Sequence, residues 1–130
     1  MELNERRVTR VKENSRLVAA RLLGAIGQSG HTVREYHHGM FVTVHHPTWS
    51  QPRSTDCLLQ RAVQGCSAVA VRVHRATSFG FNFTVLCEVL DTVTGLFCLR
   101  VSVSDEPEPT MTLMAQALSN ALLADEDIPG

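Results

Sequence analysis

Four histidines form the cluster with the clearest chemical potential in this sequence. They come as adjacent pairs on either side of Gly39, namely His37, His38, His45 and His46. Cross-strand neighbours in a hairpin lie about 5 Å apart, so imidazoles from the two pairs can meet at a metal ion. Adjacent residues of a strand point to opposite faces, however, so each pair supplies at most one ligand, and only Glu35 adds a nearby carboxylate. We therefore favour hydrogen-bonded or pH-sensitive strand histidines and expect no metal or other cofactor.

The four cysteines show no spacing typical of a zinc or haem site. They are Cys57, Cys66, Cys87 and Cys98, separated by 9, 21 and 11 residues without a C-x-x-C pair. Cys87 and Cys98 fall in expected strands with different side-chain parity. We interpret all four as structural thiols in a reducing compartment.

A catalytic site is not specifically indicated. Cys57 with His46, oriented by Asp56, is one available combination, but any chain with four cysteines and six histidines offers several. The sequence contains no G-x-S-x-G, phosphate-loop or dinucleotide motif, and its acidic residues lie mainly in the C-terminal connector and tail. We expect a protein that is not an enzyme.

Hydrophobic periodicity predicts one α+β domain over residues 1–124, followed by an acidic tail over 125–130. The expected elements are an N-terminal helix from about Asn4 to Gly27, a hairpin of strands over 31–38 and 40–46, a short helix over Ser54 to Gln64 with Gly65 as its stop, three strands within 67–104, and a final helix from Thr110 to Ala124. The N-terminal helix has an apolar stripe that we expect to pack on the subunit's own sheet, because its heptad pattern is too short for a confident coiled coil.

Alternating apolar residues define the last three strands, which we expect to form an antiparallel meander. They are Val69, Val71 and Val73, then Phe81, Phe83, Val85, Cys87 and Val89, then Phe97, Leu99, Val101 and Val103. A period of two places each of these sets on one face, which we expect to cover a core. Asp105 to Pro109 then indicates a stiff acidic connector, which we expect to hold the final helix away from the strand before it.

The net charge of −1 conceals opposite charges at the two ends of the chain. Residues 1–24 carry six Arg or Lys against three acids, whereas residues 105–130 carry six acids and no base. This polarity predicts either head-to-tail assembly or contact between the two ends within one subunit. The basic end is short and few aromatic residues accompany it, so we expect no nucleic-acid partner.

We also find no secretory signal pattern in Met1 to Asn14 and no apolar run of membrane-spanning length, which predicts a soluble intracellular protein.

Several short motifs resemble a family of small adenovirus proteins, the products of the third open reading frame of early region four. In order they are Gly39-Met40-Phe41-Val42, His46-Pro47, Cys57-Leu58-Leu59, Val63-Gln64, His74, Ala76-Thr77 and Glu88-Val89-Leu90-Asp91. The resemblance implies a non-enzymatic viral early protein that dimerises through a β core and assembles into scaffolds in the host nucleus. It also implies capture of host factors, including components of promyelocytic leukaemia bodies.

The chain departs from this family at positions that matter for assembly. Ser67 stands where the family has an Asn associated with assembly, and Thr84 and Val85 stand where it has an Asp-Leu pair. Family members also end soon after the Glu-Val-Leu-Asp motif, whereas this chain adds a strand and a helix. Polymerisation is therefore not carried over from the resemblance.

The sequence thus favours an interaction protein that forms a homodimer or higher oligomer and captures protein partners. The contact candidates are the edge strand near His74 and the stripe Met111, Met114 and Leu118, although such a stripe is more often simple core. Two alternatives stay open: a small dimeric chaperone like those of bacterial secretion systems, and a roadblock-like regulatory module, whose element order fits better. The viral interpretation predicts the host nucleus, and the alternatives predict the cytoplasm.

Overall fold

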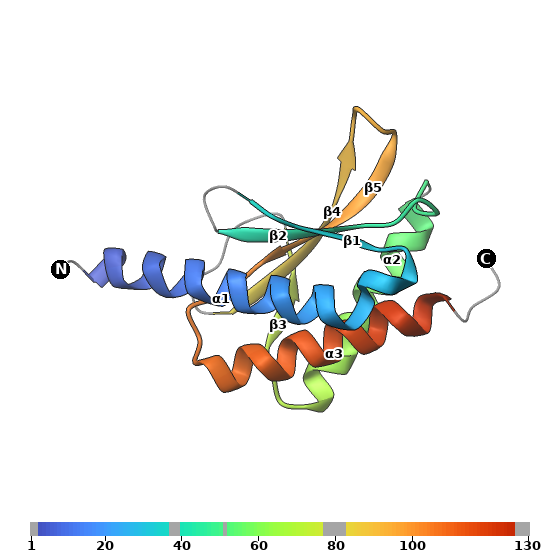
Figure 1. Ribbon diagram of the computed structural model, residues 1–130. Coiled ribbons are helices and arrows are strands. Elements are labelled where there is room, and N and C mark those ends of the chain that lie inside the picture. Colours follow the sequence, from blue (N-terminus) through green and yellow to red (C-terminus); the bar gives the residue numbers. More distant parts are fainter. Residues whose placement is uncertain (1–2, 37–39, 51, 77–82, 127–130) are drawn as a thin grey trace.

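Three helices lie on one side of a five-stranded sheet in the computed structural model, which describes residues 3–36, 40–50, 52–76 and 83–126 (Figure 1). In chain order the elements are α1 (Leu3–Ile26), the short 3-10 helix η1 (Gly27–Ser29), β1 (Thr32–Glu35), β2 (Phe41–His45), α2 (Pro52–Ala68), β3 (Val73–Arg75), β4 (Thr84–Asp91), β5 (Leu96–Ser102) and α3 (Glu108–Glu126). The predicted α+β class is confirmed.

The N-terminal helix forms where its periodicity predicts. Its stripe residues Val11, Val18 and Leu22 are buried, and α1 packs against α3 and the first two strands. Packing within the subunit is thereby confirmed. The 3-10 helix η1, which follows α1, ends at Gly30, whose φ of 88° is a left-handed conformation that glycine adopts without strain.

The strands follow the order β1-β2-β5-β4-β3. The predicted first hairpin is confirmed, because β1 pairs antiparallel with β2. The predicted antiparallel pairing of β4 with β5 is also confirmed. The three-stranded meander is wrong, because β3 runs parallel to β4. The connection between them includes residues 77–82, which lie outside the described part of the chain, as do His37, His38 and Gly39.

The middle helix is longer than predicted, and this shortens the strand after it. Gly65 does not stop α2, and the helix continues to Ala68. A Cβ at Gly65 would lie 3.7 Å from the carbonyl oxygen of Ala117, so α2 and α3 are in van der Waals contact at this position. The amide of Val71 donates to the carbonyl of Cys66 at 2.9 Å, and Ala70 takes a φ of 61°. These contacts close the helix, so the residues before Val71 belong to its terminal turn and not to β3.

Side chains on the helix-facing side of the sheet form the core with the three helices. In the sheet they are Val42, Val44, Val73, Leu86, Leu99, Val101 and Val103. For β5 this is the predicted face. For β4 the predicted face is wrong, because Leu86 points to the helices whereas Val85 and Cys87 pair in register with Ser102 and Arg100 on the opposite face.

The final helix extends beyond its predicted limits at both ends. It begins at Glu108, so Pro109 lies in its first turn, where a proline is tolerated, and it continues to Glu126. The first two residues of the predicted acidic tail are therefore helical. The helix also lies against α1 and α2 (Figure 1).

Candidate interaction surfaces

The sequence singles out seven residues for assembly or partner contact: Ser67, His74, Thr84, Val85, Met111, Met114 and Leu118. They fall into two groups by burial. The Met111, Met114 and Leu118 stripe is almost completely buried in the core of one subunit, so it is not a partner surface and its interpretation as core holds. Thr84 and Val85 are also buried. Only Ser67 and His74 are exposed, on α2 and β3 respectively, at the same edge of the sheet.

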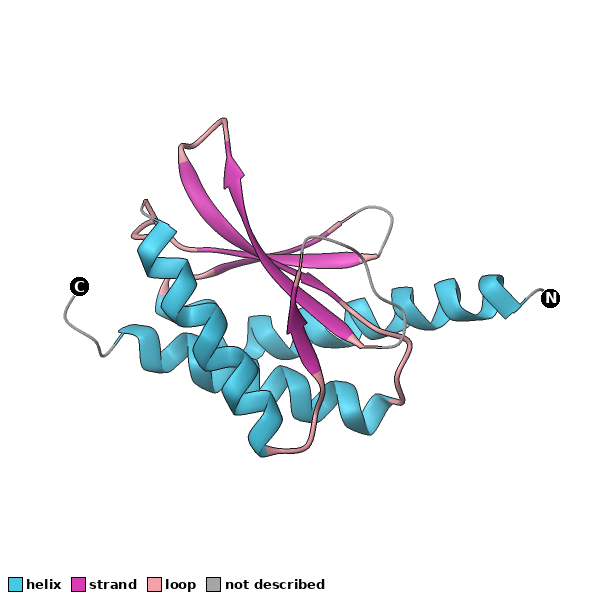
Figure 2. Cartoon of the chain, turned by 180° about the vertical axis from the view of Figure 1, so that it is seen from behind, coloured by secondary structure: helices cyan, strands magenta, loops and turns pink. Residues whose placement is uncertain are grey.

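The face of the sheet opposite the helices is covered by none of the described helices (Figure 2). We call it the helix-free face. Register places three rows on it: Phe41, Ser102, Val85 and His74; Arg34, Thr43, Arg100 and Cys87; and Thr32, His45, Cys98 and Val89. A solvated sheet face normally carries polar and charged side chains. Here the charged members of the three rows are Arg34 and Arg100, and the guanidinium carbon of Arg100 lies 5.8 Å from the centre of the Phe41 ring. The β4 members of the rows are uncharged.

Two thiols, of Cys87 and Cys98, and two hydroxyls, of Thr43 and Ser102, are buried on this face. Cys87 and Cys98 are diagonal neighbours on adjacent strands, because the odd-numbered residues of β4 and the even-numbered residues of β5 lie on the same face. Both are free thiols, and burial raises the pKa of each above its ordinary value. Protonated, desolvated thiols are poor nucleophiles, so these residues are structural. The hydroxyl of Ser102 has no hydrogen-bond partner within the described residues.

The hairpin of β4 and β5 projects beyond its neighbours in the sheet (Figure 1). Pairing with β3 ends at Leu86, and pairing with β2 begins at Cys98, so residues 89–97 form a two-stranded segment that we call the ribbon. Three of its aliphatic side chains are exposed, with Val89 at 37%, Leu90 at 50% and Val93 at 92%. An isolated two-stranded ribbon is marginally stable in water unless something packs against it.

The tip of the ribbon is ordered by its own hydrogen bonds. Asp91 Oδ1 accepts from the amides of Val93 at 2.9 Å and Thr94 at 3.4 Å, and the carbonyl of Asp91 accepts from Gly95 at 2.8 Å. The backbone donations lower the pKa of the Asp91 carboxyl. Val93 is thus held outward on a defined turn. The sequence signal for the ribbon is the adjacent apolar pair Val89-Leu90 together with Val93 inside a turn segment, which a period of two does not detect.

The opposite end of the sheet finishes at β3, whose outer edge pairs with no described strand. His74 lies on the helix-free face, and its ring is 4.3 Å from that of Phe83, centre to centre. A hollow of about 340 Å³ runs beside this edge and is lined by Val63 and Ser67 of α2 together with the segment Ala70–Val73. The predicted edge position of His74 is observed, and its contact role stays a prediction.

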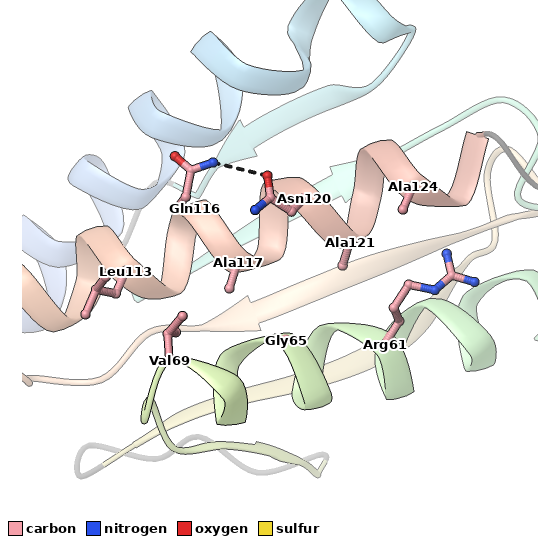
Figure 3. Close-up of a pocket in the computed structure, with 9 residues that line it drawn as sticks. All are labelled: Arg61, Gly65, Val69, Leu113, Gln116, Ala117, Asn120, Ala121 and Ala124. Carbon is pink, nitrogen blue, oxygen red and sulfur yellow. Dashed lines mark hydrogen bonds between the residues drawn. The ribbon is translucent and has the colours of Figure 1, made fainter.

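A second hollow, of about 300 Å³, lies between α2 and α3 (Figure 3). Its lining residues are Arg61, Gly65, Val69, Leu113, Gln116, Ala117, Asn120, Ala121 and Ala124. Gln116 donates to Asn120 at 3.1 Å on the rim. None of the nine is a His, Cys, Asp or Glu, so the hollow contains no nucleophile or general base.

The histidines that the structure describes serve packing and hydrogen bonding. His45 and His46 point to opposite sides of β2's end: the His45 ring contacts the hydroxyl of Thr43 at 2.8 Å, and the His46 ring contacts the hydroxyl of Thr48 at 2.8 Å and lies against His31. No group of three or more potential metal ligands occurs within the described ranges, and His37 and His38, the other two histidines considered as ligands, lie outside them. Cys57, the candidate nucleophile, is exposed on α2.

Comparisons with known proteins return no match for this chain, whether with family models, curated proteins or solved structures. Among the described helices, none has both the length and the apolarity needed to cross a bilayer.

Proposed function

We propose that this chain is a non-enzymatic interaction protein that associates with a second copy and binds other polypeptides through surfaces that one subunit leaves uncovered. The observation that carries the proposal is the ribbon, which holds Val89, Leu90 and Val93 in water on a fixed backbone. Fully burying one such side chain contributes about 1.5–3 kcal/mol, and an ordered tip loses little entropy on binding. Exposed apolar residues on a rigid projection are therefore suited to contact another chain.

The viral interpretation rests on the sequence resemblance alone. Its last motif, Glu88-Val89-Leu90-Asp91, coincides with the base of the ribbon. On this basis we propose an early protein that captures and reorganises host nuclear factors, located in the host nucleus, with the ribbon as a capture surface.

A roadblock-like regulatory module in the cytoplasm is the second candidate. The observed order places the middle helix after two strands and before three, as this alternative requires and as the secretion-chaperone alternative does not. Co-purification separates the candidates, because a small GTPase as the specific partner favours the regulatory module and nuclear proteins favour the viral one.

The ribbon is tested with a phage-displayed peptide library panned on the immobilised full chain. We expect peptides with apolar anchors that bind the wild type and lose at least about tenfold in affinity on Val93→Asp or Leu90→Asp, which corresponds to about 1.4 kcal/mol. Thr92→Asp, in the same exposed turn, is the matched control and retains binding. Recovery of no peptide, or equal binding to all variants, contradicts a role for the ribbon.

A further inference from the structure

We infer that the hollow between α2 and α3 binds an amphipathic helix of a partner protein, which lies along it with its apolar face toward this chain (Figure 3). We call this hollow the helix groove. The inference rests on the proposed binding of other polypeptides, and it adds the class of partner and a surface separate from the ribbon.

The helix groove is elongated and follows the axes of two helices. Its lining residues recur at helical spacing: Leu113, Gln116, Ala117, Asn120, Ala121 and Ala124 on α3, and Arg61, Gly65 and Val69 on α2 and its terminal turn. At 1.5 Å per residue the two stretches extend about 16 Å and about 12 Å. The floor lies where the helices touch, since a Cβ at Gly65 would be 3.9 Å from the Cβ of Ala117. The occupant is therefore two to three helical turns long.

The walls of the helix groove are depleted of charge. Residues 109–124 of α3 include no charged side chain, and Arg61 is the one charged residue over 57–71 of the chain. The exposed positions of α3 between these limits are Leu113, Gln116, Asn120 and Ala124. A helix that faces only water normally carries charged residues on its exposed face, whereas loss of charge is typical of the centre of an interface. An uncharged apolar surface complements these walls.

Two large apolar side chains are exposed at one end of the helix groove. Leu113 is 48% exposed and Val69 is 40% exposed, and they lie at the end opposite Arg61 and Ala124 (Figure 3). The positions between the two ends carry small side chains or none, so another helix can approach closely there with its larger apolar residues between the two walls. The exposed pair supplies the apolar contact that anchors it.

The backbone of the occupant determines its conformation. Within α2 and α3 the main-chain groups bond to one another, so the walls of the helix groove offer few partners to an incoming backbone. An extended peptide in an apolar groove would bury N–H and C=O groups without hydrogen bonds, whereas a helix satisfies its own. The occupant is therefore helical.

The openness of the helix groove favours a polypeptide over a small molecule. Leu113, Gln116, Asn120 and Ala124 are all exposed along its length. Small-molecule sites are concave and bury most of the ligand surface, which an open valley between two touching helices does not do. An amphipathic helix needs only its apolar face covered, as in other helix-in-groove complexes.

A library of helical peptides tests the site. Alanine-based 16-residue peptides, randomised at i, i+3, i+4 and i+7 and displayed on phage, are panned on the immobilised full chain. We expect enrichment of Leu, Ile, Met or Phe at the randomised positions, and a loss of at least about tenfold in affinity on Leu113→Glu. Leu23→Glu is the matched control, because Leu23 is also an exposed leucine on a helix, at 57%, and lies on α1; it retains binding.

Two further measurements keep the test decisive. Ala124→Glu changes an exposed residue at the other end of the helix groove and should weaken the same peptides, with circular dichroism reporting the fold of every variant. A proline at the centre of a selected peptide breaks its helix and should abolish binding.

The possible failures are distinguishable. The inference is overturned by a library without enrichment, by equal weakening on Leu23→Glu, or by undiminished binding of the proline-containing peptide. Dissociation of a wild-type oligomer by Leu113→Glu would identify the occupant as a second copy and also overturn it. Val93→Asp should leave these peptides bound, so the helix groove can fail while the ribbon stands. If neither Leu113→Glu nor Val93→Asp weakens any selected peptide, the proposed binding of polypeptides at these surfaces falls as well.

Discussion

The side chain of Arg7 meets that of Asp105 across 98 residues of sequence: Nε donates to Oδ2 at 2.8 Å. Arg7 lies in the basic α1, and Asp105 lies in the acidic connector between β5 and α3. Of the two outcomes that the polarity of the chain predicted, contact within one subunit is the one observed. Asn14 reinforces it, because its Nδ2 donates to the carbonyl oxygens of Ser104 and Glu106, each at 2.8 Å.

The Arg7–Asp105 ion pair is expected to contribute modestly to stability. Both side chains are about one quarter exposed, so solvent screens the attraction. A double-mutant cycle with Arg7→Ala and Asp105→Ala, measured by urea denaturation, should give a coupling of about 0.2–1 kcal/mol that shrinks in high salt. A coupling that is absent at low salt would show that the pair contributes nothing.

Asn14 is expected to matter more than the ion pair. Its side chain is buried, and Asn14→Ala would leave two carbonyl groups without their donor. We expect a loss of about 1–3 kcal/mol in the free energy of unfolding. Asn120→Ala is the control, because this exposed amide bonds only to Gln116 among the interactions described, and its loss should change stability by less than about 0.5 kcal/mol.

Two glycine-to-alanine changes should have opposite signs. Gly24 lies inside α1 with open space around the position of a Cβ, so Gly24→Ala should stabilise the fold by about 0.5–1 kcal/mol. Gly30 has a left-handed φ, and a Cβ there would lie 3.2 Å from Nε2 of His46, so Gly30→Ala should destabilise it by about 1–2 kcal/mol. Thermal melts of both variants check the pair, and stabilisation by Gly30→Ala would contradict the assigned backbone conformation.

His45 should make stability depend on pH near neutrality. Desolvation lowers its pKa below the ordinary value of 6.5, with the Arg34 charge acting in the same direction. The unfolded chain therefore binds a proton more readily than the folded one. The stability gained from a neutral His45 in the folded state is fully present above pH 6.5. It is lost as the pH falls through the interval between 6.5 and the folded pKa.

Urea denaturation over a pH series measures this dependence. The slope of unfolding free energy against pH in that interval should be smaller in His45→Gln than in the wild type. Equal slopes would show that His45 is not the group responsible.

Local periodicity was sufficient for most elements of the fold. The α1 stripe, the first hairpin, the β5 face and the α3 stripe all follow from spacing, because each buries one face against the core. One error concerns the end of α2. Gly65 predicts a helix end, but the helix continues to Ala68 and closes where the Val71 amide donates to the Cys66 carbonyl.

The orientation of β4 and β3 could not be predicted from parity. Both faces of β4 carry apolar residues, and only the register with β5 determines that Leu86, not Val85, points to the helices. The parallel pairing of β3 is a long-range property with no local signature. The candidate surfaces also depended on long-range packing. The Met111, Met114 and Leu118 stripe is buried in the core, and the projection of the ribbon follows only from the strand order.

Multi-angle light scattering on the full wild-type chain, over a wide range of concentrations, tests self-association most directly. Self-association predicts a species of at least twice the subunit mass of 14.3 kDa whose population rises with concentration. A constant mass of 14.3 kDa throughout would contradict it.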